Sequence, residues 1–163
     1  MTEFQRLFLV QARSDFAVFK LLRKDRRLPQ CHALHYLQMA TELLGKAQAW
    51  RQGPRTHTHA AFVGFLLGLI SNRDAQRAIG FTGRNANWRN MIQKSVPLAE
   101  RVQSLAPALN PDGPNPEYPW PRTAPRFAPV EYVFELSREL QKPAGGKFLN
   151  LVDSLFAAAE AFL

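Results

Sequence analysis

Arginine and histidine side chains are concentrated in one short segment of the chain, RQGPRTHTH, from Arg51 to His59. A histidine can accept the proton of a ribose 2′-hydroxyl near neutral pH, and an arginine can stabilise the charge on a phosphate. These residue types, close together, could form a catalytic pair. The catalytic candidates are Arg51, His57 and His59, and Arg55 is a candidate phosphate ligand.

Two other interpretations of this segment stay open. Gly53 and Pro54 interrupt it, so Arg51 and His57 cannot lie on one continuous helix. Either threonine of the segment can cap a helix N-terminus, and the segment could therefore be a structural helix start with a histidine packed inside. It could also bind nucleic acid or a nucleotide without cleaving it.

A second arginine-containing segment, RNANWR, runs from Arg84 to Arg89. Guanidinium groups form planar, bidentate hydrogen bonds with phosphate, and the amide of Asn85 can donate a further one. The segment contains no histidine and so no general base. We expect Arg84, Asn85 and Arg89 to bind phosphate without cleaving the RNA.

Polar side chains line one side of the helix that is predicted from about Pro29 to Trp50. Their spacing of three or four residues places them on one narrow face, while the rest of the helix is largely apolar. Lys46 can pair with an acidic residue one turn earlier and is also a candidate phosphate ligand. The stripe is either a buried hydrogen-bonded network or the wall of a groove, and its members are Cys31, His35, Gln38, Glu42 and Lys46.

The run HALHYLQMATELLGKAQ, followed by a glycine turn and THTH, resembles HEPN domains (higher eukaryotes and prokaryotes nucleotide-binding). Residues 1–105 follow the helix order of that family. Leu43 stands where the family often has a lysine, and Arg89 stands where the second arginine segment would need a histidine. The residues that match the family's helix motif are Gln38, Ala40, Glu42, Lys46 and Ala47.

The resemblance implies a small dimeric α-helical bundle in a prokaryotic toxin–antitoxin or phage-defence system. It also implies an RNA or nucleotide ligand, and an antitoxin or other defence component as a protein partner. Many members are metal-independent endoribonucleases that use an arginine and a histidine, and others are inactive. On the resemblance, the expected function is therefore RNA or nucleotide binding, with endoribonuclease activity as an open alternative.

The helix-like apolar periodicity predicts an all-α fold, a bundle of about five to six helices with no strand. We expect helices over residues 2–24, 29–50, from Thr56 or Thr58 to Asn72, over 87–109, a short one over 130–140, and one over 147–163. The segment RDAQRAIG should be a turn. The third helix carries no charge and should be central.

The chain is expected to form a single domain, residues 1–163. A core bundle spans residues 1–106, a proline-rich strap spans 107–129, and the C-terminal helices span 130–163. The strap contains eight of the 12 prolines and cannot be regular structure. Its aromatic residues Tyr118, Trp120 and Phe127 predict that it is ordered and anchored on the bundle.

The C-terminal stretch KFLNLVDSLFAAAEAFL carries more apolar surface than a helix at the edge of a bundle needs. It could form a homodimer interface, or the strap could cover it within one chain. This surface supports a different functional class as the alternative: a catalytically silent adaptor that binds a partner protein.

The formal net charge of +8 is consistent with polyanionic partners, and a contribution to solubility alone is the alternative. The longest apolar run is too short to cross a bilayer, and the N-terminus lacks the order of a signal peptide, so we expect a cytoplasmic protein that does not bind a membrane. No glycine-rich phosphate loop is present, and the histidine spacing matches no zinc finger, so we expect no cofactor and no metal.

Overall fold

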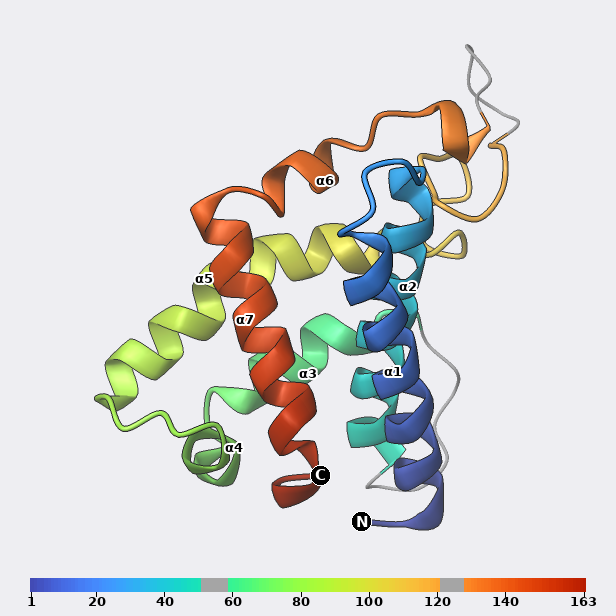
Figure 1. Ribbon diagram of the computed structural model, residues 1–163. Coiled ribbons are helices and arrows are strands. Elements are labelled where there is room, and N and C mark those ends of the chain that lie inside the picture. Colours follow the sequence, from blue (N-terminus) through green and yellow to red (C-terminus); the bar gives the residue numbers. More distant parts are fainter. Residues whose placement is uncertain (51–58, 121–127) are drawn as a thin grey trace.

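The computed structural model describes residues 1–50, 59–120 and 128–163, and all regular secondary structure in these ranges is helical (Figure 1). The all-α helical bundle predicted from the sequence is confirmed. Seven α-helices lie in the described ranges rather than five or six, because residues 73–78, expected to be part of a turn, form a short helix.

Helices α1 (Glu3–Leu22) and α2 (Gln30–Ala49) form an antiparallel pair joined by a short loop (Figure 1). The first begins at a capping box. The Gln5 amide donates to the Thr2 hydroxyl over 3.3 Å, and the Thr2 amide donates to the Gln5 side chain over 2.8 Å. These bonds satisfy two backbone donors that a bare helix end leaves unpaired.

Helix α3 (Ala61–Leu69) is shorter at both ends than the predicted helix, which ran from Thr56 or Thr58 to Asn72. Thr56 and Thr58, the expected caps, lie outside the described residues, and Ala60 occupies the cap position without a side-chain hydrogen bond. At Gly45 a β-carbon would lie 2.6 Å from the Ala61 carbonyl, so this glycine lets α2 and α3 approach closely.

The prediction that the third helix is central is only partly correct. One face is buried in the core through Phe62, Phe65, Leu66 and Leu69. The opposite face is exposed, at Gly64, Leu67 and Gly68. The absence of charge therefore did not mean burial on every side, since glycine can occupy an exposed face at no hydrophobic cost.

The predicted turn RDAQRAIG is wrong: helix α4 (Arg73–Ala78) occupies this segment. The Asn72 side chain caps it by accepting the Ala75 amide over 2.9 Å. Helix α5 (Asn85–Gln103) follows and continues through Pro97, whose ring is exposed. Pro97 thus neither ends α5 nor starts a new helix.

The described part of the strap, residues 107–120, contains no helix or strand and is anchored by Trp120. Gly113 has a φ of +93°, and a β-carbon there would lie 2.2 Å from the Trp120 indole. Only glycine suits that position. Tyr118 is exposed, so its predicted role as an anchor is wrong, and Phe127 lies outside the described residues.

The C-terminal part contains the short turn η2 (Pro129–Glu131), helix α6 (Glu135–Glu139), helix α7 (Pro143–Ala158) and a final turn η3 (Ala159–Ala161). The helix predicted over 130–140 is thus reduced to five residues. The last helix begins earlier than predicted, because Pro143 fits its first turn and Gly145 and Gly146 are within it.

The apolar surface of the C-terminal stretch is core. Stacked rings join Phe156 to Phe16 of α1 at 4.6 Å, and further ring contacts join this stretch to α3. Helices α1 and α3 of the same chain, rather than the strap, therefore cover the surface that could have formed a dimer interface. The buried residues are Phe148, Leu149, Leu151, Val152, Leu155, Phe156, Phe162 and Leu163.

Candidate phosphate-binding site

The polar stripe of α2 contains an internal network around Glu42. The Gln38 amide donates to Glu42 Oε2 over 2.7 Å, and Nδ1 of His59 lies 2.9 Å from the same oxygen. The Lys46 ammonium pairs with the other carboxylate oxygen. Glu42 is 9% exposed, so a buried carboxylate has a full set of partners.

The electrostatics of Glu42 follow from this geometry. Burial raises the pKa of the carboxyl, but hydrogen bonds and positive charge from Lys46 and His59 outweigh it and hold the pKa below its ordinary value. The carboxylate therefore stays ionised at neutral pH. Of the two interpretations of the stripe, the hydrogen-bonded network describes this half of it.

The residues of the segment RQGPRTHTH divide into two groups. Arg51, Arg55 and His57 lie outside the described residues. His59 is the described member, and Glu42 holds its ring by one nitrogen. A carboxylate that orients an imidazole in this way leaves the second nitrogen free for chemistry. Lys46 already has an internal partner, so we place it in the network and not among the phosphate ligands.

Hydrogen bonding is less complete in the other half of the stripe, around His35 and Cys31. His35 Nδ1 lies 3.5 Å from a Glu117 carboxylate oxygen of the strap and has no hydrogen bond. On α1, Asp15 is buried: one oxygen accepts from Gln11 over 2.8 Å and the other has no partner. Burial raises the pKa of Asp15, although the Gln11 hydrogen bond and the nearby His35 oppose the shift. At Cys31, burial likewise raises the pKa of the thiol.

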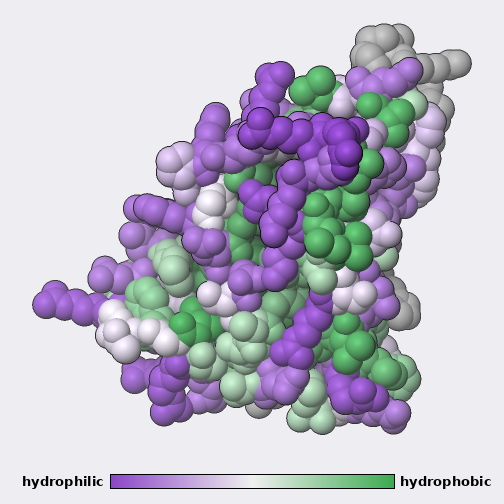
Figure 2. Space-filling model, viewed as in Figure 1, coloured by the Kyte–Doolittle hydropathy of each residue, from purple (hydrophilic) through white to green (hydrophobic). Residues whose placement is uncertain are grey.

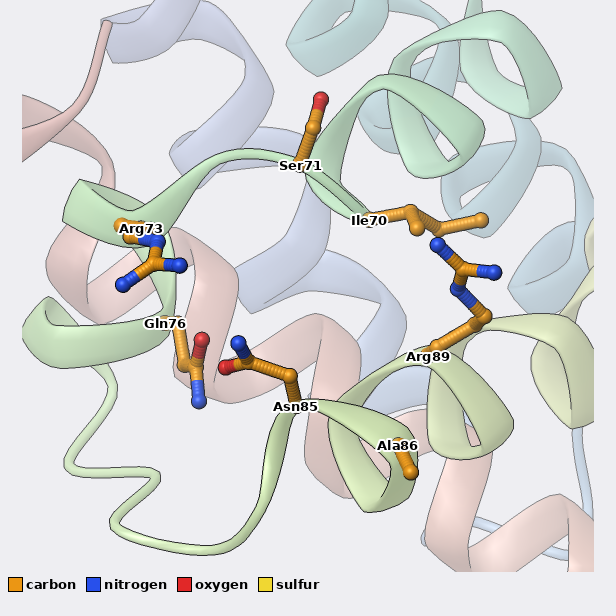
Figure 3. Close-up of a pocket in the computed structure, with 7 residues that line it drawn as sticks. All are labelled: Ile70, Ser71, Arg73, Gln76, Asn85, Ala86 and Arg89. Atoms are coloured by element: carbon orange, nitrogen blue, oxygen red, sulfur yellow. The ribbon is translucent and has the colours of Figure 1, made fainter.

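A different constellation lies where α4 meets the start of α5. The guanidinium groups of Arg73 and Arg89 flank a pocket of about 450 Å³, and the amides of Gln76 and Asn85 lie between them (Figure 3). Ser71 and Ile70, at the end of α3, close the third side. The pocket is open to solvent, and two guanidinium groups and two side-chain amides supply it with hydrogen-bond donors.

The charges of this pocket have no internal counterpart. Neither Arg73 nor Arg89 forms an ion pair within the described part of the chain. The N-terminus of the 19-residue α5 has no side-chain cap from Arg84, so its first backbone N–H groups add positive potential beside the arginines. Two guanidiniums, two side-chain amides and a helix N-terminus together form a strong anion-binding arrangement.

The pocket is held by a buried tryptophan. The Trp88 indole donates to the Leu69 carbonyl over 2.8 Å and is 1% exposed. Leu69 precedes the pocket residues Ile70 and Ser71, and Trp88 precedes Arg89. This hydrogen bond therefore fixes the end of α3 against the first turn of α5.

The sequence-predicted phosphate ligands are only partly brought together here. Asn85 and Arg89 line the pocket, whereas Arg84 is exposed at the cap of α5 and does not line it. Arg73 and Gln76 lie outside the segment RNANWR and line the pocket from α4. The capping residue Asn72, which marks a helix start, was the sequence signal for that helix.

Arg77 and the basic segment at residues 23–27 do not line this pocket. Arg77 pairs with Asp74 over 2.6 Å. The basic segment at residues 23–27 lies in the α1–α2 loop, at the opposite end of the molecule from α4 (Figure 1). There Arg27 pairs with Asp25 over 2.6 Å.

Within residues 1–50, 59–120 and 128–163, no three histidine, cysteine, aspartate or glutamate side chains gather as a metal site would require. Across the same ranges, no helix combines the length and apolar character that a membrane span needs.

Comparisons with known proteins identify no relative: no protein-family model, no curated protein and no solved structure matches the chain.

Proposed function

We propose that this protein binds RNA through its phosphates, with the pocket between α4 and α5 as the principal contact. The observation that carries the proposal is the pair Arg73 and Arg89, which form no ion pair with any described residue and flank the Gln76 and Asn85 amides (Figure 3). Guanidinium and amide donors that converge on an open pocket suit phosphate oxygens. The net charge of +8 supports the same ligand class.

The wider setting is part of this proposal. The helix motif of α2 resembles HEPN domains, and an all-helical fold is compatible with that family. A cytoplasmic role in a prokaryotic toxin–antitoxin or phage-defence system, with a homodimer or an antitoxin as partner, follows from the resemblance and remains a proposal.

The binding test is titration of a fluorescently labelled single-stranded RNA at several salt concentrations. The Arg73→Gln/Arg89→Gln variant should lose roughly 10-fold or more in affinity at low salt. Its slope of log affinity against log salt should fall by about two, since about two phosphate contacts disappear.

The Arg23→Gln/Arg27→Gln variant is the matched control, because it removes the same charge at the other end of the molecule. Equal losses in both variants would mean that binding follows net charge alone, and the pocket would not be the site.

Endoribonuclease activity is a second candidate, favoured by the contact between His59 and Glu42. A carboxylate-oriented histidine can act as a general base towards a ribose 2′-hydroxyl. The test is incubation of structured and single-stranded RNA in EDTA with the wild type and with His59→Asn, Arg51→Ala and His57→Ala variants. Cleavage that persists in EDTA and is lost in these variants supports the enzyme. Intact RNA in every reaction rejects cleavage and leaves the binding proposal standing.

The adaptor alternative also has a specific observation. Four large apolar side chains project from one side of α1 and are 47–68% exposed: Phe4, Leu7, Val10 and Leu21. Figure 2 shows hydrophobic surface on this side of the molecule, interspersed with hydrophilic side chains. A partner or second copy bound there should be lost in a Leu7→Glu/Val10→Glu variant, as measured by light scattering during size-exclusion chromatography. A monomeric wild type in this measurement would argue against a homodimer.

A further inference from the structure

A second pocket lies between α5 and α7 and has no role in the proposed RNA contact. Its volume is about 640 Å³, within the usual range for small-molecule sites. It shares no lining residue with the arginine pocket, since it opens on a different face of α5. Its lining comes from three parts of the chain: residues 79–81, the first half of α5 and most of α7.

One wall of this pocket is apolar and includes an aromatic ring. Phe81 is half-buried against Trp88, with ring centroids 5.5 Å apart and a tilt of 54°. Met91 of α5 and Leu151 of α7 continue the wall. A flat ligand can stack on the Phe81 ring, and the Met91 thioether makes favourable contacts with aromatic edges.

The rest of the lining is positively charged or amide-bearing. Lys94 of α5 and Lys147 of α7 both line the pocket, and neither forms an ion pair within the described residues. Asn87, Asn90 and Asn150 supply donors and acceptors. No acidic side chain lines the pocket to neutralise the two lysines.

We propose that this pocket binds a small aromatic anion, a planar ring that carries a carboxylate or a phosphate. The ring lies against Phe81, Met91 and Leu151, and the anionic group lies between Lys94 and Lys147. The apolar wall alone would accept a neutral ring and the lysines alone would accept any anion, so the combination selects molecules that have both. The site is independent of RNA binding at Arg73 and Arg89.

The test is isothermal titration calorimetry of the whole protein with five probes. The aromatic anions are 1-naphthoate and adenosine monophosphate, the neutral rings are naphthalene-1-methanol and adenosine, and the fifth probe is inorganic phosphate. At least one aromatic anion should bind at least about 10-fold more tightly than its neutral counterpart and than inorganic phosphate. Preference for naphthoate identifies a carboxylate ligand, and preference for adenosine monophosphate identifies a phosphate ligand.

Variants locate the site. Lys94→Met/Lys147→Met keeps the apolar stems and removes both charges. It should therefore lower the affinity for the aromatic anion to that for the neutral ring. Phe81→Ala should weaken every ring-bearing probe. Arg6→Met/Lys24→Met is the control, because it removes two exposed positive charges that do not line the pocket, and it should bind as the wild type does.

Three results would overturn the proposal. The first is absence of binding by both aromatic anions at millimolar concentration. The second is equal affinity of an anion and its neutral counterpart. The third is unchanged affinity in the lysine double variant, provided that its melting temperature matches that of the wild type. RNA titration probes the arginine pocket, so a negative calorimetry result leaves the proposed function intact. A negative RNA titration likewise leaves the proposed site between α5 and α7 intact.

Discussion

Two groups of charged side chains in the described part of the chain have opposite surroundings. On α2, Glu42 and Lys46 are nearly buried and paired with each other, and His59 completes the set. At the junction of α4 with α5, Arg73 and Arg89 are exposed and have no ion-pair partner among the described residues.

The difference follows from solvation. A charge removed from water must find an opposite charge or a hydrogen bond, so buried ionic groups carry their partners with them. An exposed arginine has water as a partner and can exchange it for a ligand. The paired charges of the α2 network, with His59 at its exposed rim, therefore favour a structural role. The lack of ion pairs at the α4–α5 junction, among the described residues, favours the binding role proposed for it.

The largest effect on stability is expected from Glu42→Ala. This change leaves the Lys46 ammonium nearly buried without its carboxylate, which should lower the free energy of unfolding by about 2–4 kcal/mol. Urea denaturation followed by circular dichroism measures it. A loss below about 0.5 kcal/mol would show that the network is solvated and that the contrast between the two regions is false.

The same network predicts an acid response. Because the folded protein lowers the Glu42 pKa below its ordinary value of 4.5, the carboxylate contributes stability above that pH. The contribution is lost as the pH falls through the lower pKa of the folded state. The stability difference between the wild type and Glu42→Gln should therefore shrink as the pH falls from neutral through that range. A difference that does not change with pH would exclude the ionised pair.

A smaller effect of the opposite sign is expected at Asp15. One of its carboxylate oxygens is buried without a partner, so Asp15→Asn should stabilise the fold at neutral pH by about 1 kcal/mol. Since folding raises the Asp15 pKa, the protonated form is favoured in the folded state, and its advantage is lost as the pH rises through the raised value. The gain in melting temperature should vanish at acidic pH, where the wild-type carboxyl is protonated. A destabilised variant at neutral pH would show that the charged form is well solvated.

The smallest effect is expected where a charge pair is fully solvated. Arg77 and Asp74 are 79% and 66% exposed, so Arg77→Ala should change the free energy of unfolding by less than about 0.5 kcal/mol. It should also leave the salt dependence of RNA binding nearly unchanged. A large loss of affinity would extend the binding surface beyond the pocket along α4.

The sequence predicts the long helices best, because an apolar period of 3.6 residues that is sustained over many residues seldom arises by chance. The helices expected at residues 2–24, 29–50 and 87–109 correspond to α1, α2 and α5. Helices α4 and α6 are too short to show a period. The stretch PAGG, residues 143–146, has the proline and glycine content of a loop between two helices, but it forms the first turn of α7. Proline suits a first helical turn, and tertiary packing can hold glycine within a helix.

The candidate site was less predictable than the fold. The segment RNANWR identified Asn85 and Arg89, and Arg73 and Gln76 join them through the path of α4, whose local signal in the sequence is the capping residue Asn72. The polar stripe was visible as a face of α2, and only the structure shows that Glu42 is its centre. In the sequence, both the α2 stripe and the segment RNANWR were groups of charged and polar side chains. The structure distinguishes them, because the α2 network is nearly buried and the arginines at the α4–α5 junction are exposed.

The Trp88–Leu69 hydrogen bond has a consequence for the speed and strength of binding. It closes the chain segment that carries α4, so the entropy cost of bringing the two walls of the arginine pocket together is met during folding. Under the proposed function, a phosphate would then enter a preorganised site and need not order a loop.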